Sequence, residues 1–283
     1  MNEVVKKESL PVAVKSGFNT DFFIHKLEAA FGKDESKKED FKSALITISQ
    51  DKNLANCNVN TIFSSAFCLA SLGLSLNKTL GLGYVLKYKQ DAQPVISYKG
   101  WQVIASRAGI MVKADSVFSC DEFSRDLSSF DEKIVFKPAD NNKERKPSND
   151  EWYLKNLTGV LVRLKDTISG FEKSSFVPAD KLAKIRNMSP SANPSFSPHK
   201  SWAEEMNRAK AIKYVLSKEP LDEKRQIIAQ AVSAENEFID IDAQSPISAP
   251  KITQIDLNAI AYEQGEGQII DENGEVLSER EGR

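Results

Sequence analysis

The sequence has few of the residues that metal binding and nucleophilic catalysis most often use. Its 283 residues include only three cysteines, Cys57, Cys68 and Cys120, and two histidines, His25 and His199. No two cysteines form a C-x-x-C pair, and the four clustered ligands that a structural zinc site needs are absent. We therefore expect no metal and no cofactor. The cysteines are interpreted as buried or half-buried thiols of a reducing compartment.

Long apolar runs are also lacking. No stretch is long enough to cross a bilayer, and residues 1–15 lack the apolar block of a secretion signal. These absences lead us to expect a cytoplasmic protein. An apolar content of 41% and a charged content of 28% are ordinary for a globular chain. The length suffices for one sizeable core or for two small domains.

Enzyme signatures are missing as well. The sequence contains no G-x-x-x-x-G-K-[ST] phosphate loop and no G-x-S-x-G nucleophile motif, and Gly81-Leu-Gly83 is too short for a dinucleotide fingerprint. Asp121 and Glu122 are adjacent carboxylates of the kind that a metal nuclease uses. Neighbours on a strand point to opposite faces, however, so a solvated or salt-bridged turn is the alternative interpretation. We expect a protein that is not an enzyme.

Charge is distributed unevenly along the chain. Residues 235–283 contain twelve acidic and three basic residues, a net charge of −9, whereas residues 1–234 carry +7. A basic body with an acidic tail is typical of nucleic-acid binders. We assign residues 1–19 to a mobile N-terminus, 20–234 to the folded core that would bind nucleic acid, and 235–283 to a largely disordered acidic tail.

Hydrophobic periodicity predicts an α+β fold: a central antiparallel sheet of hairpins flanked by helices, with a disordered acidic C-terminal tail. Apolar residues at three- and four-residue spacing predict helices over 20–32, 38–50, 60–73, 99–107, 180–187, 200–217 and 222–234. Alternation predicts strands over 82–89, 93–98, 112–118, 133–137, 157–165 and 171–177. Turns are expected at 91–92 and 168–170, a mobile loop at 138–151 and a further loop at 188–199.

The segment Tyr98-Lys99-Gly100-Trp101 stands where a strand becomes a helix. Gly100 permits close approach of another backbone, and the exposed N–H groups of the first helical turn favour phosphate, with Lys99 adding charge. Arg107, two turns on, is a candidate for a second phosphate. Tyr98 and Trp101 offer flat surfaces for bases, with core packing as the alternative.

Basic residues share faces on several predicted elements. The pairs are two or four residues apart on strands: Lys87 with Lys89, Lys133 with Lys137, and Arg163 with Lys165. A sheet face of this kind tracks a phosphate backbone, although an ordinary solvated face is the alternative. On the last strong helix we expect Arg208 to pair with Glu204, four residues earlier. Lys210 and Lys213 are expected to be freer.

The order and spacing of several blocks resemble phage RecT-type recombinases. The blocks are "IFSSAFCLASLGLSLN" (62–77), "LGYVLKY" (82–88), "ISYKGWQVIASRAG" (96–109) and "VFSCDEF" (117–123), followed by weaker agreement at 171–189 and 202–220. The resemblance spans residues 20–225. It departs in "NRAKAIK", which lacks the denser basic cluster associated with that family. We assign the following residues to DNA binding: Lys87, Lys89, Tyr98, Lys99, Trp101, Arg107, Arg163, Lys173, Arg186, Arg208, Lys210 and Lys213.

The resemblance implies a protein that binds single-stranded DNA and anneals complementary strands into duplex without ATP. It implies a homo-oligomer, as a ring or helical filament, in homologous recombination, with strand invasion as an additional activity. It further implies a partner exonuclease and a host single-strand DNA-binding protein contacted through the tail. The alternatives are a passive coating protein, a metal nuclease using Asp121, Glu122 and Asp126, and a structural assembly protein.

Overall fold

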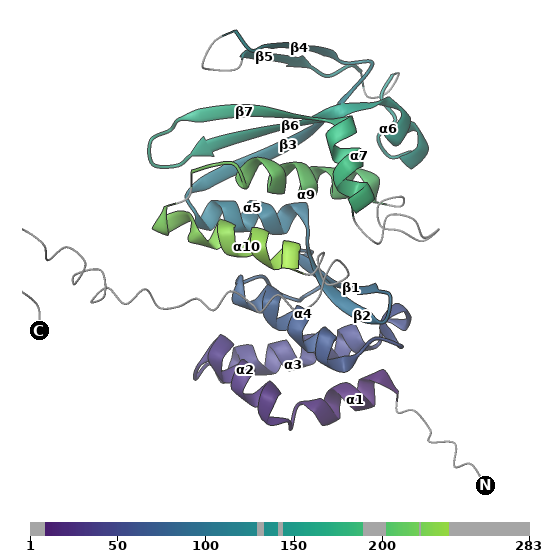
Figure 1. Cartoon of the computed structure of the whole chain (residues 1–283), viewed down its shortest axis with the longest axis vertical. Helices are drawn as coiled ribbons and strands as arrows, with labels where there is room; N and C mark the ends of the chain where they lie inside the picture. Colours follow the sequence, from purple (N-terminus) through teal and green to yellow (C-terminus); the bar gives the residue numbers. More distant parts are fainter. Residues whose placement is uncertain (1–8, 129–132, 141–143, 189–201, 221, 238–283) are drawn as a thin grey trace, which may run out of the picture. The chain divides into compact units, whose positions relative to one another are not determined.

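The fold is described from a computed structural model, for residues 9–128, 133–140, 144–188, 202–220 and 222–237. These residues belong to one compact unit, Met1–Ile241. Helices and antiparallel hairpins make up the unit, which confirms the predicted α+β class (Figure 1). In place of one central sheet, the strands of the described residues form three separate antiparallel sheets. The predicted acidic tail lies outside the described residues from residue 238 onward.

The first layer is helical: α1 (Leu10–Gly17), α2 (Asp21–Phe31), α3 (Glu35–Ser49), the short η1 (Lys52–Leu54) and α4 (Val59–Ser71). Thr20 caps α2 by accepting from the Phe23 N–H, as expected for a threonine at that position. Phe23 is fully buried among other phenylalanine rings. The expectation that residues 1–19 are mobile is wrong for α1, because its Leu10 and Val14 are buried in the same core.

A two-stranded hairpin follows, made of β1 (Gly83–Tyr88) and β2 (Asp91–Ile96). Its turn lies at residues 89–90, where Lys89 has a left-handed φ of 50°. The predicted turn at 91–92 is therefore two residues late, because Asp91 already pairs with Tyr88. Pro94 lies inside β2 opposite Val85, which is tolerated because each strand of this sheet has a partner on only one side.

Helix α5 (Tyr98–Arg107) begins where β2 ends. The Ser97 hydroxyl accepts from the Gly100 N–H and donates to the Gly81 carbonyl, so it caps the helix and ties it to the chain before β1. A Cβ at residue 100 would collide with the Leu82 carbonyl oxygen. The close backbone approach predicted for Gly100 is thus present, and only glycine fits there.

The largest sheet has the order β3 (Ile110–Phe118), β6 (Leu157–Asp166), β7 (Glu172–Pro178), with β6 in the centre. Val112, Val160 and Val162 face α5 and α9 (Ala203–Leu216), which cover one side of the sheet (Figure 1). Helix α7 (Ala179–Met188) packs beside α9, and η2 (Glu223–Arg225) leads into α10 (Gln226–Glu237). Each of these helices overlaps a predicted one.

The third sheet is the hairpin β4 (Glu122–Asp126) and β5 (Lys133–Lys137), drawn on the other side of the three-stranded sheet in Figure 1. The ring centres of Phe123 in β4 and Phe176 in β7 lie 4.5 Å apart, and this contact holds the hairpin over that face. Helix α6 (Asp150–Asn156) places Tyr153 against Phe118 in a small second core. The sequence predicted neither β4 nor α6.

Candidate nucleic-acid interface

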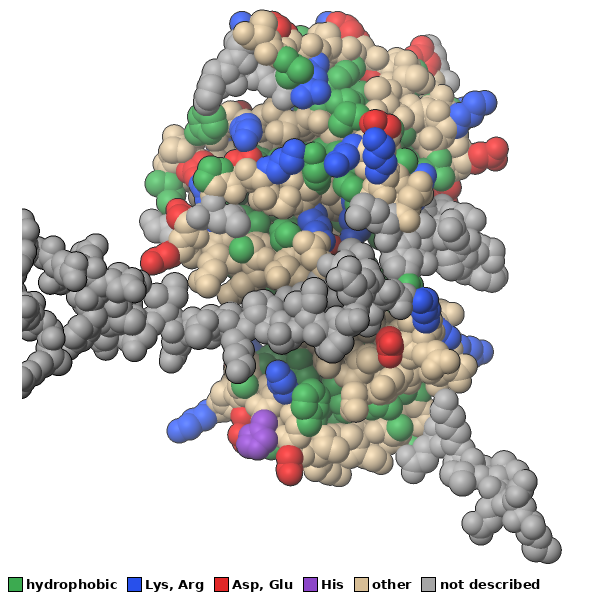
Figure 2. Space-filling model, viewed as in Figure 1, with side chains coloured by type: hydrophobic (Ala, Val, Ile, Leu, Met, Phe, Trp, Pro, Cys, Tyr) green, Lys and Arg blue, Asp and Glu red, His purple; other side chains and the backbone are tan. Residues whose placement is uncertain are grey.

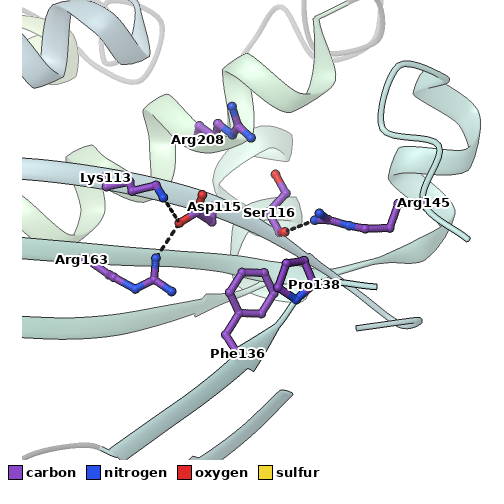
Figure 3. Close-up of a pocket in the computed structure, with 8 residues that line it drawn as sticks. All are labelled: Lys113, Asp115, Ser116, Phe136, Pro138, Arg145, Arg163 and Arg208. Carbon is purple, nitrogen blue, oxygen red and sulfur yellow. Dashed lines mark hydrogen bonds and ion pairs between the residues drawn. The ribbon is translucent and has the colours of Figure 1, made fainter. Parts of the chain in front are cut away.

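A cavity of about 270 Å³ opens at the free edge of β3 (Figure 3). Four cationic side chains reach it from four separate segments: β3, the segment after β5, β6 and α9. We call it the β3-edge cavity. It is lined by Lys113, Asp115, Ser116, Phe136, Pro138, Arg145, Arg163 and Arg208. The convergence of three arginines and a lysine on one hollow makes it a candidate site for an anion.

Strand alternation and register bring the charges of Lys113, Arg163 and Asp115 together. Lys113 pairs directly with Arg163 across β3 and β6, on the face turned away from α5 and α9. Asp115 lies two residues further along the same face of β3. One of its oxygens is 2.7 Å from Arg163 Nη1 and 3.6 Å from Lys113 Nζ. Arg163 and Asp115 remain partly exposed, with side-chain exposures of 40% and 24%, so solvent reaches the pair.

Arg145 forms one wall of the cavity and is held firmly. Its Nη2 donates to the Ser116 carbonyl at the edge of β3, and its Nε lies 3.2 Å from the Asp121 carboxylate. The guanidinium also lies 4.8 Å from the centre of the Phe118 ring. This arginine fastens the segment after β5 to the edge of β3 and gives the wall a fixed positive charge.

Asp121 has a structural role at this corner. Its fully buried carboxylate accepts from the N–H groups of Phe118 and Ala139, besides its contact with Arg145. Glu122, its neighbour, is exposed and pairs with Lys137 across the hairpin. The described part of the chain has no group of three or more His, Cys, Asp or Glu residues arranged to hold a metal ion.

Arg208 lies on the opposite wall, on α9. It pairs with Glu204 at 2.6 Å, which confirms the predicted intrahelical contact. Its Nε is buried, and no acceptor for it exists among the described residues. Glu204 in turn accepts weakly from the Ser116 hydroxyl, which also bonds to the Tyr153 hydroxyl. Burial raises the pKa of Tyr153 to about 12, so this group stays neutral while its hydroxyl bonds to Ser116, which lines the cavity.

Lys210 and Lys213 lie elsewhere, at a buried ion cluster between α9 and α10. Both ammonium groups contact Glu235 Oε2, at 3.0 and 3.1 Å, and Glu235 Oε1 accepts from the Ile96 N–H. Lys213 also donates to Asn236. The expectation that these lysines are freer is wrong, because their partner is a residue that the sequence assigns to the acidic tail.

Burial opposes the ionisation of Glu235 and of Lys213 in this cluster. It raises the pKa of Glu235, but Lys210, Lys213 and the Ile96 N–H outweigh it and hold that pKa below its usual range. Burial lowers the pKa of Lys213, with Glu235 acting in the opposite direction. The carboxylate is thus charged at neutral pH and joins α10 to α9 and β2.

The residues of the predicted α5 site separate in space. Lys99 is exposed on the first turn and has no ion-pair partner in the described part of the chain, which leaves it available for phosphate. Arg107, at the other end of α5, donates from both terminal nitrogens to the carbonyls of Leu72 and Gly73. Trp101 is fully buried, and Tyr98 is half-buried against the core, as the packing alternative expects.

The remaining predicted residues are dispersed. Lys87 is exposed on β1, and Lys89 occupies the hairpin turn with its Nζ 5.5 Å from the centre of the Tyr88 ring. Lys173 pairs with Glu219, and Arg186 is half-buried in the last turn of α7. Of the predicted set, only Arg163 and Arg208 meet in the β3-edge cavity.

Two cavity residues, Lys113 and Arg145, are absent from the predicted set. Alternation along 112–118 places Lys113 and Asp115 on one face of the strand. Together with the pairing of β3 and β6, this pattern would have indicated that Lys113 lies beside Arg163. Arg145 comes from a polar segment without periodicity, so local sequence offers no sign of its position. Figure 2 shows further Lys and Arg side chains spread over the region of the three-stranded sheet, interspersed with acidic ones.

Fold and site together describe an α+β protein whose β3-edge cavity is lined by three arginines and one lysine. Residues 39–247 match the sequence model of the RecT family, which is most of the chain. The chain belongs to the RecT family, whose members are single-strand DNA annealing proteins of phage recombination. No curated protein gives a significant match. Among the described helices, none is long and apolar enough to span a membrane.

Proposed function

We propose that this protein binds single-stranded DNA through its phosphates and anneals complementary strands without ATP. Annealing is downhill, because stacking and pairing in the product provide the driving force. The protein therefore has to neutralise phosphates and keep bases accessible. Backbone contacts that ignore sequence suit this task, since any complementary pair must be accepted.

The β3-edge cavity is the observation that carries the proposal beyond family membership. Three arginines and one lysine from distant segments converge there, with Asp115 as the one carboxylate in its lining. Arginine forks recognise phosphate oxygens in a two-pronged geometry. Lys99 adds an exposed, unpaired charge on the described surface of α5. These cations supply contacts that any DNA sequence satisfies equally.

Several finer features belong to the same proposal. The protein acts as a ring or helical filament, because many weak contacts along one strand give strong binding when subunits are linked. It receives its strand from a partner exonuclease and contacts a host single-strand DNA-binding protein through residues beyond α10. Strand invasion is a further activity of the assembled form.

The decisive experiment mixes two complementary fluorescent oligonucleotides with the full chain, without nucleotide and with EDTA present. We expect pairing well above the spontaneous rate, with both strands left intact. Tight binding without faster pairing would make this a coating protein. Degradation of the strands when magnesium replaces EDTA, abolished by Glu122→Gln but not by Lys137→Gln, would favour the nuclease alternative, because both substitutions break the same exposed ion pair.

A further inference from the structure

We propose that the β3-edge cavity binds one phosphate group of single-stranded DNA, and that Asp115 is the internal competitor which this phosphate displaces from Arg163. The proposal rests on the proposed function, because DNA is the source of the phosphate. It adds a defined pocket, and a residue that lowers the affinity of that pocket.

The cavity has donor capacity that the protein itself does not use. Among the described residues, Arg163 and Arg208 each have one carboxylate partner, Asp115 and Glu204 respectively, although a guanidinium carries five N–H donors. Both side chains are partly exposed, at 40% and 28%, so an anion in the cavity can reach them. Arg145 is already fixed by Ser116 and Asp121, so its charge is in place before any ligand arrives. The cavity can therefore accept an anion larger than the Asp115 carboxylate.

Asp115 occupies the cation cluster in the free protein. It contacts both Arg163 and Lys113, the two most exposed cations of the cavity, whose side chains are 40% and 69% exposed. A carboxylate and a phosphate compete for the same guanidinium fork. Because the pair is partly solvated, its contribution to stability is small and a phosphate displaces it readily. Figure 3 shows Asp115 between Lys113 and Arg163, with Arg208 on the other wall.

The competition has a functional consequence. A cavity with four cations and no carboxylate would hold each phosphate tightly and slow its release. Annealing requires that strands shift register until complementary bases meet, so each contact has to exchange quickly. Asp115 weakens the individual contact, and the assembled protein recovers overall affinity through the number of contacts.

The test compares Asp115→Asn with Glu172→Gln in the full chain. Both substitutions remove one negative charge from the same face of the sheet and leave an amide, but Glu172 pairs with Lys165 outside the cavity. Binding of a fluorescein-labelled oligothymidylate is measured by anisotropy. We expect Asp115→Asn to tighten binding about fivefold and Glu172→Gln to change it less than about twofold. Equal gains would assign the effect to net charge and overturn the proposal.

A double-mutant cycle locates the effect. If Asp115 acts by occupying Arg163, the gain in binding affinity from Asp115→Asn should disappear when Arg163 is also replaced. In the Arg163→Gln background, Asp115→Asn should then tighten binding no more than the Glu172→Gln control does. An undiminished gain would show that Asp115 acts on another group and would contradict the proposal. Thermal unfolding of each variant confirms that the fold is retained, and Lys113→Gln provides a second cavity variant at an exposed position.

Two further experiments distinguish failure of the proposed pocket from failure of the proposed function. Thymidine monophosphate replaces the oligonucleotide in the first experiment. If only the mononucleotide responds to Asp115→Asn, the cavity serves a free nucleotide, and the proposal fails. Annealing is measured in parallel in the second experiment. Normal annealing with an unresponsive Asp115 would refute the pocket alone, whereas a responsive Asp115 without annealing would refute only the proposed function.

Discussion

Glu235 Oε2 lies 3.0 Å from Lys210 Nζ, in a contact that joins the last described helix to α9. Glu235 is 4% exposed, so the pair is shielded from water. In the sequence, this glutamate is the first residue of an acidic stretch and its partner is a candidate DNA-binding cation. Their pairing includes Glu235 of α10 in the packed core and removes Lys210 from the exposed cations.

Glu235→Gln is expected to destabilise the protein. The substitution leaves Lys210 and Lys213 buried beside each other without a counter-charge, and breaking such a pair costs about 3 kcal/mol. Urea denaturation followed by circular dichroism measures the free energy of unfolding. The exposed pair Lys165–Glu172 is the control, and Glu172→Gln is expected to cost less than about 1 kcal/mol. Equal losses would show that burial of the cluster does not matter.

The same cluster predicts a pH dependence. The pKa of Glu235 is lower in the folded state than its ordinary value of 4.5. As pH falls, Glu235 is therefore protonated at a higher pH in the unfolded chain than in the folded protein. The stability that its carboxylate contributes is complete above the ordinary pKa of 4.5 and is lost as pH falls below it. The wild type should lose stability more steeply than Glu235→Gln below about pH 4.5. Parallel curves for the two proteins would contradict the assigned charge state.

Lys99 and Arg107 are expected to respond differently to alanine substitution. Lys99→Ala leaves the fold unchanged, weakens binding to all sequences alike, and reduces the salt slope of single-strand binding by about 0.7. Arg107→Ala removes two hydrogen bonds to the carbonyls of Leu72 and Gly73 and lowers the free energy of unfolding by about 1–3 kcal/mol. Salt titrations and urea denaturation on both variants separate the two roles. A sequence-selective loss with Lys99→Ala would count against a backbone contact.

Gly100→Ala is expected to be costly despite the mild substitution. The added Cβ meets the Leu82 carbonyl oxygen, so α5 or the chain before β1 has to move, at about 1–3 kcal/mol. Ser106→Ala, at an exposed position of the same helix, should stay within about 0.5 kcal/mol of the wild type. A tolerated alanine at position 100 would show that the two segments are further apart than described.

Truncation after α10 tests the revised boundary of the core. Deleting residues 238–283 removes ten acidic and three basic residues and leaves Glu235 in place. We expect this variant to anneal naked strands as fast as the full chain or faster, because the removed charge is negative. Deleting residues 235–283 also removes Glu235 and should lower the melting temperature. If the shorter deletion abolished annealing, the tail would be part of the annealing core.

Periodicity was sufficient to predict most elements, because amphipathic helices and alternating strands carry their burial pattern locally. Helix α1 was missed because its eight residues are too few to show a helical period, although Leu10 and Val14 complete a core formed by later helices. The turn of the first hairpin was placed late because Pro94 suggested the start of a strand. An edge strand accommodates this proline in its interior.

The site was less predictable, since it depends on contacts between distant segments. Arg163 was singled out from its own strand, but its partner Asp115 is 48 residues away. Glu235 and Lys210 are separated by 25 residues. Charge counted along the chain gives no information about which cations are neutralised across space. The buried state of Trp101 likewise depends on how α5 packs against other elements.

The most direct test of the central claim measures how fast the full chain pairs two complementary labelled strands, without nucleotide and with EDTA. The wild type is compared with the double variant Arg163→Gln/Arg208→Gln. Lys165→Gln/Lys184→Gln, which removes two exposed cations outside the cavity, is the matched control. We expect the wild type and the control to accelerate pairing similarly, and the cavity variant to lose most of the acceleration while remaining folded. Equal rates for all three proteins would show that the β3-edge cavity has no part in annealing.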